Sequence, residues 1–244
     1  MPSLVEDAVA IGAAKQVVGV SHFTSDIPEV AKIERVGDFS SISLEQIVKL
    51  HPDVIVGIPS QAALLAPLQR LHYRIVLVPD DAYDDIFTDI QALGRITGHE
   101  FRATALVRSL KIQTARLSHE ASARRYHPRV FVALGTGPIW TAGPRSYIAK
   151  LIALAGGTDA VTTLPSAYAQ FSSEALLALQ PDIIITDPAV QLSAVLRREP
   201  WRSLKAVQRG RIYTVDPPAI LQRPGPRYIR GLQWLIDHLQ QSHK

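Results

Sequence analysis

The stretch SLEQIVKLHPDVIV at residues 43–56 decides the fold, because residues 172–185 repeat it as SSEALLALQPDIII. At a constant offset of 129, six of the fourteen positions are identical, and four more exchange one aliphatic residue for another. Each copy predicts a short amphipathic helix with a serine N-cap, a Pro-Asp break and a buried strand. A repeat on this scale indicates two copies of one supersecondary plan, and therefore two similar lobes.

The repeat also admits a purely local explanation. Helix, Pro-Asp and strand form a common junction, and both Pro and Asp favour turns. That explanation accounts less well for the glutamate at the same place in both copies, Glu45 and Glu174. A carboxylate in the first turn either complements the helix dipole or gives each copy a matching acidic contact for a partner. The residues alone leave both functions of the glutamates open.

Strand and helix patterns alternate on both sides of the repeat, which predicts an α/β protein with mainly parallel sheets. Residues 101–125 contain no Pro or Gly and predict one long, rigid helix. We therefore expect a first lobe at 1–98, a connecting helix at 99–126 and a second lobe at 127–244. Strands are expected at 16–20, 54–56, 75–78 and 130–134, and further helices at 4–12, 44–50, 62–71 and 84–94.

Composition excludes several classes of site. The chain has no cysteine, so disulfides, thiolate metal ligands and a cysteine nucleophile are excluded. The formal charge is +4, but Lys and Arg are spread along the sequence, and the densest basic cluster, around Arg197 and Arg202, sits among Glu and Pro. The chain shows no basic stripe interleaved with aromatics, so no nucleic-acid partner is expected. Histidine and acidic residues lack zinc- or calcium-binding spacing, and no serine lies in a nucleophile elbow. We expect no metal, no cofactor and no catalytic residue, and hence not an enzyme.

The order of short motifs along almost the whole chain resembles the periplasmic substrate-binding proteins of cobalamin and ferric-siderophore ABC importers. No single motif is specific, but their order and spacing together are. The motifs are Pro2-Ser3, Glu6, Gly12, Val17 to Ser21, Pro28, Arg35-Val36-Gly37, Ser43-Leu44-Glu45, Pro52 to Val56, Gly143, Ala155-Gly156-Gly157, Ser173-Glu174, Pro181-Asp182 and Arg223 to Arg227.

The resemblance implies two lobes joined by a rigid helix, a ligand cleft between them, and limited closure when ligand binds. In that family, the glutamates aligned with Glu45 and Glu174 pair with arginines on the two permease subunits. The resemblance therefore favours the docking function of the repeated glutamates. It further implies a monomer that captures a cobalamin-type corrinoid and delivers it to the permease.

Ligand contacts are expected beyond the carboxyl ends of the strands, where open α/β sheets bind ligands. Aromatic rings there would supply flat contact area for a macrocycle, and an arginine would pair with a carboxylate, phosphate or amide oxygen. Gly57 stands where cobalamin-binding members can carry another aromatic, which leaves the ligand open. The expected contacts are His22, Phe23, Phe39 and Ile58 from the first lobe, and Trp140, Tyr168, Phe171 and Arg223 from the second.

The amino end departs from the family pattern. In the family, Pro-Ser follows a first β-strand, whereas here Pro2-Ser3 follows Met1 directly, and no signal peptide is visible. We expect a periplasmic or surface-anchored protein whose first strand and signal are missing through shortening or a misplaced start. Without that strand, the first lobe's sheet should be one strand short.

Two other functions remain open at this point. A ferric-siderophore or haem binder of the same class would suit the basic charge and Arg223. A two-lobed α/β enzyme that transfers glycosyl groups is a remote alternative, because it would need a phosphate-binding loop or a catalytic acid. The sequence Gly135-Thr136-Gly137 lacks the further glycine and lysine of such a loop.

Overall fold

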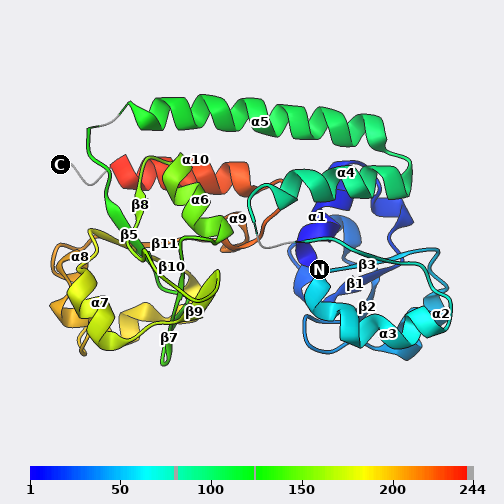
Figure 1. Cartoon of the computed structure of the whole chain (residues 1–244), viewed down its shortest axis with the longest axis horizontal. Helices are drawn as coiled ribbons and strands as arrows, with labels where there is room; N and C mark the ends of the chain where they lie inside the picture. Colours follow the sequence, from blue (N-terminus) through cyan, green and yellow to red (C-terminus); the bar gives the residue numbers. More distant parts are fainter. Residues whose placement is uncertain (80–81, 124, 241–244) are drawn as a thin grey trace. The chain divides into compact units, whose positions relative to one another are not determined.

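The computed structural model describes residues 1–79, 82–123 and 125–240. The chain divides into two compact units, each described here by itself. The first unit comprises Met1–Leu110 with Pro224–Pro226, and the second comprises Lys111–Arg223 with Arg227–Lys244. Both combine parallel strands with helices (Figure 1). No helix in the described ranges has both the length and the apolar character needed to cross a membrane.

The first unit contains two separate pairs of parallel strands. Strand β1 pairs with β2, and β3 pairs with β4. The strand expected at 16–20 begins later than expected, because residues Ala14–Gln16 form a 3-10 turn, and β2 was not expected at all. The elements are α1 (Pro2–Ala10), β1 (Gly19–Ser21), β2 (Glu34–Gly37), α2 (Leu44–Leu50), β3 (Ile55–Gly57), α3 (Ala62–Arg70), β4 (Ile75–Leu77) and α4 (Asp85–Thr97).

The second unit is built on a four-stranded parallel sheet in the order β11-β10-β5-β8. After β5 the chain enters a small antiparallel sheet with the strand order β6-β7-β9. The strands are β5 (Arg129–Val132), β6 (Gly135–Thr136), β7 (Ile139–Ala142), β8 (Thr158–Asp159), β9 (Tyr168–Gln170), β10 (Ile183–Thr186) and β11 (Ile212–Thr214). The helices are α6 (Tyr147–Leu154), α7 (Ser173–Leu179), α8 (Lys205–Gln208), α9 (Ala219–Gln222) and α10 (Tyr228–Gln240).

The long helix expected between residues 99 and 126 is α5 (Glu100–Ser122). The boundary between the two units falls inside it, after Leu110, so neither unit ends where the helix does. In the second unit a hydrogen bond of 2.6 Å joins the buried Thr114 hydroxyl on α5 to the Tyr228 hydroxyl on α10. The carboxyl-terminal half of α5 is therefore part of that unit's packed body.

The sequence repeat is also a structural repeat. Ser43 and Ser172 each cap a seven-residue helix, accepting hydrogen bonds from the N–H groups of Gln46 and Ala175 at 3.3 and 3.0 Å. Both helices end at a residue in the left-handed region, and both lead through Pro-Asp to a parallel strand, β3 or β10. The two segments therefore share the serine N-cap, the helix length, the left-handed residue at the helix end and the Pro-Asp junction to a strand.

The two repeated strands differ in burial. In β10 every residue is buried, as expected for a strand covered on both faces and paired on both edges. Its core includes Phe131 and Trp201, whose ring centroids lie 6.4 Å apart. In β3, Ile55 and Val56 are only partly buried, and β3 pairs with one strand alone among the described residues. The first unit therefore lacks the continuous sheet that its counterpart has.

Asp159, at the end of β8, makes the stability of the second unit depend on pH. Burial raises the pKa of its carboxyl group from 3.8 to about 6, although a hydrogen bond of 3.0 Å from the Val161 N–H opposes the shift. Its Oδ2 atom is buried and has no hydrogen-bond partner among the described residues. The folded state consequently holds the proton more tightly than the unfolded state does.

The stabilising contribution of the Asp159 proton is fully present below pH 3.8 and is lost as pH rises through about 6. We expect Asp159→Asn to remove this contribution, since asparagine stays neutral. Urea denaturation at pH 4 and pH 7 should then show a smaller fall in the unfolding free energy for the variant than for the original chain. Equal falls in the two proteins would contradict the assignment.

Candidate functional site

Three loops of the first unit follow the carboxyl ends of β1, β2 and β3. His22 and Phe23 come directly after β1, and Phe39 lies two residues after β2. Because β1 and β2 are parallel, with Ser21 opposite Gly37, their following loops emerge at the same edge of the sheet. Open α/β sheets bind ligands at this edge.

The aromatic rings on these loops are unusually exposed. Phe23 is 62% exposed and Phe39 is 54% exposed, and His22 beside Phe23 is exposed as well. Large apolar side chains that stay in water at neighbouring positions are typical of a binding surface. The structure thus places three of the expected contacts where a ligand can reach them.

Two polar residues hold these loops in place: Asp38, which the sequence did not single out, and Gln61, which follows the strand expected at 54–56. The Asp38 carboxylate accepts hydrogen bonds from the N–H groups of Ser40 and Ser41 at 2.9 and 2.8 Å. These bonds, Ser40 first, lower the pKa of Asp38, and the nearby His22 adds to the effect. The buried Gln61 side chain donates to the Asp38 carbonyl at 3.5 Å, so the loops after β2 and β3 are linked.

Ile58 does not offer a contact surface. Its side chain is only 2% exposed, and its N–H donates to the Gln61 side chain at 3.4 Å. The prediction placed it on an exposed loop because it directly follows β3. In the structure its side chain is buried, so it stabilises the loop and does not face solvent.

The second unit presents a tryptophan on its antiparallel sheet. Trp140, on β7, is 40% exposed while the other residues of that strand are buried. Trp140 lies opposite Gln170, and Ala142 lies opposite Tyr168, so Trp140 and the partly buried Tyr168 share one face of the sheet. The two expected ring contacts are therefore diagonal neighbours.

The remaining two expected contacts lie in different environments. Phe171 is partly buried and packs on the core, with its ring centroid 5.8 Å from that of Phe131. Arg223 follows α9 and is partly exposed. The preceding residue, Gln222, donates a hydrogen bond of 2.6 Å to the Asp187 carboxylate at the carboxyl end of β10. Arg223 is thereby attached to the strand edge, whereas Phe171 mainly supports the fold.

Asp187 is another residue of the candidate site that the sequence did not single out. It is buried directly after β10, and its carboxylate also accepts a hydrogen bond of 2.7 Å from the Ala189 N–H. Like Asp38, it is an acid that follows a strand and ties down the loop beyond it. A polar residue directly after a buried strand is the signal that could have identified it.

Glu45 and Glu174 lie in the first turns of α2 and α7, and both are exposed. Neither carboxylate is needed as a cap, because Ser43 and Ser172 already bind N–H groups there. The two acids are therefore available to solvent at equivalent positions of the two units.

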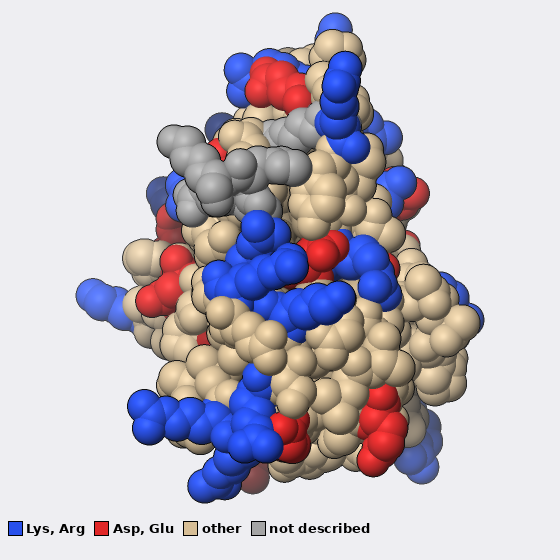
Figure 2. Space-filling model, turned by 90° about the vertical axis from the view of Figure 1, so that its left-hand side faces the viewer, with Lys and Arg blue, Asp and Glu red and all other residues tan. Residues whose placement is uncertain are grey.

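Charged surface and metal-ligating residues add no further site. On the face drawn in Figure 2, basic side chains gather in several groups with uncharged and acidic residues between them. Within the described residues, no group of three or more His, Asp or Glu side chains is arranged to hold a metal ion. What the geometry provides is exposed aromatic surface, on loops after strands in the first unit and on β7 in the second.

A comparison with protein families matches residues 2–219 to the periplasmic binding protein model. The chain belongs to this family. Two lobes and a non-enzymatic, ligand-binding function, both expected from the sequence, are confirmed by this membership.

Periplasmic binding proteins from several bacteria are similar over nearly the whole chain. The uncharacterized ABC transporter substrate-binding lipoprotein YvrC of Bacillus subtilis is 28% identical over 98% of this chain and 78% of its own length. The vitamin B12-binding protein of Vibrio cholerae is 27% identical over 100% of this chain and 88% of its own.

Solved structures show the same periplasmic binding protein fold. The vitamin B12-binding protein BtuF of Vibrio cholerae has a TM-score of 0.85 at 25% identity, covering 100% of this chain and 96% of that one. The haem-binding protein RhuT of Roseiflexus has a TM-score of 0.89 at 22% identity, covering 100% and 97% of the two chains. At that lower identity the second likeness concerns the fold alone.

Proposed function

We propose that this periplasmic binding protein is the substrate-binding component of an ABC importer and captures a cobalamin-type corrinoid. The observation that carries the proposal is the exposed aromatic surface at the strand edges, Phe23 and Phe39 in the first unit and Trp140 in the second. Relatives named as vitamin B12-binding and ABC transporter substrate-binding proteins support it.

The chemistry of these side chains suits a large ring-shaped ligand. Phenylalanine and tryptophan rings supply rigid apolar area, and because these rings are exposed, a ligand that covers them removes this area from water. Tyr168, on the same sheet face as Trp140, adds a ring with a polar end. Arg223 provides a cation for the amide or phosphate oxygens at the margin of a corrinoid.

Delivery requires recognition by the permease, and we assign it to Glu45 and Glu174. Both are exposed and equivalent within the structural repeat, so they offer one acidic contact from each unit to the arginines of the transmembrane subunits. The protein would act as a monomer in the periplasm or anchored at the cell surface.

Haem or a ferric chelate is the second candidate, and His22 is the observation that favours it. The imidazole is exposed next to Phe23 and close enough to Asp38 to affect the pKa of that carboxyl group. A histidine with a carboxylate neighbour is a common arrangement for binding a metal centre. An iron-containing macrocycle could therefore use the same edge of the first unit.

A titration distinguishes these ligands. Cobalamin, haem and a ferric siderophore are each added to the purified chain while absorbance and tryptophan fluorescence are recorded. We expect saturable binding of cobalamin with quenching, and a smaller fractional quench in Trp140→Phe. Of the other two tryptophans, Trp201 is only 2% exposed, and Trp234 is partly buried on α10, where it stacks on His238. Binding of ferric chelates or haem alone would contradict the corrinoid proposal. In that case His22→Ala should shift the absorbance bands of the bound haem.

A further inference from the structure

Helix α3 (Ala62–Arg70) is apolar over more of its surface than its packing in the first unit requires. It reads AALLAPLQR, so no polar side chain comes before Gln69. Leu65 and Leu68 are buried and pack with Ile47 of α2 in the core. A surface helix normally carries polar residues opposite its buried stripe. The outer side of α3 lacks the polar residues expected of a helix that faces only water.

Two leucines give this outer side most of its apolar surface. Leu64 is 36% exposed, and Leu71, the residue that ends the helix, is 62% exposed. They are about two helical turns apart and therefore lie on one side of the helix, with the partly buried Pro67 between them. Exposed apolar side chains that adjoin one another are typical of an interaction surface. We call the strip formed by Leu64, Pro67 and Leu71 the α3 face.

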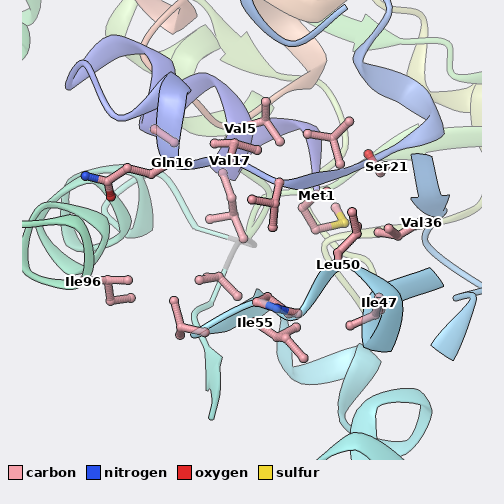
Figure 3. Close-up of a pocket in the computed structure, with 18 of the residues that line it drawn as sticks. Met1, Val5, Gln16, Val17, Ser21, Val36, Ile47, Leu50, Ile55 and Ile96 are labelled. Carbon is pink, nitrogen blue, oxygen red and sulfur yellow. The ribbon is translucent and has the colours of Figure 1, made fainter. Parts of the chain in front are cut away.

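The α3 face belongs to a helix that packs against the helix carrying Glu45. Helices α2 and α3 contact each other (Figure 1). Their inner sides line one apolar pocket within the first unit, to which α2 contributes Ile47 (Figure 3) and α3 contributes Leu65. Glu45, two positions before Ile47, lies on the opposite side of α2 and is exposed. An exposed acid on one helix and exposed apolar surface on its neighbour match the polar rim and apolar core of a protein interface.

The second unit offers no counterpart of the α3 face. Its copies of α2 and β3 are α7 and β10, but the segment after β10 forms two 3-10 turns, Pro188–Val190 and Leu192–Ala194, where the first unit has α3. Leu192 is only 3% exposed, and the other large apolar side chains of residues 188–196 are partly buried. Glu45 and Glu174 are therefore equivalent in position but differ in their surroundings.

We propose that the α3 face is the apolar core of the first unit's permease-docking surface, with Glu45 at its rim. The proposal rests on the docking function assigned to Glu45 above. The matching surface of the transmembrane subunit would place an apolar patch beside the arginine that pairs with Glu45. Docking is then asymmetric: the first unit contributes apolar burial and a charge pair, and the second contributes a charge pair through Glu174.

Apolar burial and charge pairing respond differently to salt, which makes the asymmetry measurable. Salt screens exposed ion pairs, since the Debye length falls to about 3 Å at 1 M ionic strength. Burial of apolar surface does not depend on such screening. A docking surface with an apolar core should keep part of its affinity at high salt, whereas a surface with two ion pairs alone should lose nearly all of it.

The test measures binding of the whole chain to the cognate permease in lipid nanodiscs, at about 0.1 M and about 1 M NaCl. The variant is Leu64→Gln with Leu71→Gln, because glutamine favours helix and both side chains already contact water. The matched control is Phe101→Gln with Ile112→Gln, which removes two exposed apolar side chains from α5. Empty nanodiscs of the same lipid, sedimentation analysis and urea unfolding are run for every protein.

We expect the leucine variant to bind the permease roughly tenfold to a hundredfold more weakly at low salt, because two partly exposed leucines are no longer covered. At high salt it should show no measurable binding, while the original chain and the α5 control still bind. All three proteins should unfold at similar urea concentrations.

Equal permease affinity of the leucine variant and the original chain would overturn this inference and leave the proposed function intact. An equal loss in the α5 control would overturn it too, since the α3 face would then have no special position. Leucine-dependent binding to empty nanodiscs would assign the face to lipid, and leucine-dependent dimerisation would assign it to a second copy of the chain; either result overturns the inference. Failure of the original chain to bind the permease would overturn the proposed function together with it.

Discussion

Replacing both repeated glutamates, as Glu45→Arg with Glu174→Arg, is expected to abolish ligand uptake through the cognate permease while leaving ligand affinity unchanged. On the docking proposed above, each exchange would turn an attraction to a permease arginine into a repulsion, and the two contacts would orient the protein together. The measurements are uptake of labelled cobalamin into cells that depend on this protein, and the dissociation constant of the purified variant.

A matched control separates docking from net charge and stability. Glu29→Arg with Glu120→Arg makes the same charge change at two other exposed glutamates, and should transport normally. The docking variant also loses favourable helix-dipole interactions, at roughly 0.3–1 kcal/mol per site, which is too little to unfold the chain. Weakened ligand affinity in the docking variant, or equal loss of uptake in the control, would show that the docking surface lies elsewhere.

The sequence predicted best those elements that have strong local signals at both ends. Helix α2 was predicted with its observed bounds because Ser43 caps it and Pro52-Asp53 prevents its continuation. Prediction was weaker for short strands without such signals, namely the strand expected at 16–20 and β2. Glu34–Gly37 has charged residues at its start and no alternating pattern, so only its pairing with β1 identifies it as a strand.

Candidate contacts were predictable where position alone decides them. Residues that follow strand ends were found, and Phe23 and Phe39 are exposed there, whereas Trp140 is exposed within β7 and not on the expected loop. Burial of Ile58 and packing of Phe171 against Phe131 depend on which neighbours fold over each loop, and these contacts are not encoded in local pattern. The same holds for Asp38 and Asp187, whose importance lies in the N–H groups they bind.

Exposure gives the clearest quantitative prediction for ligand binding. In the triple variant Phe23→Ala, Phe39→Ala and Trp140→Ala, cobalamin affinity should fall by roughly a hundredfold to ten-thousandfold. Each ring that becomes covered by ligand contributes on the order of 1–2 kcal/mol, and every 1.4 kcal/mol corresponds to a tenfold change in the dissociation constant. Isothermal titration calorimetry measures the change directly.

Phe101→Ala is the matched control for this loss. Phe101 is 87% exposed, more than any of the three proposed contacts, but it lies in the first turn of α5 and not on a strand-end loop. If only rings near strand ends contact the ligand, removing Phe101 should leave cobalamin affinity unchanged. If any exposed apolar surface contributed, affinity should fall. All four side chains are partly or largely in water, so neither variant creates a large core cavity and both should unfold at similar urea concentrations. If the triple variant binds cobalamin as tightly as the original chain, the exposed rings do not form the ligand site, and the corrinoid proposal loses the observation on which it rests.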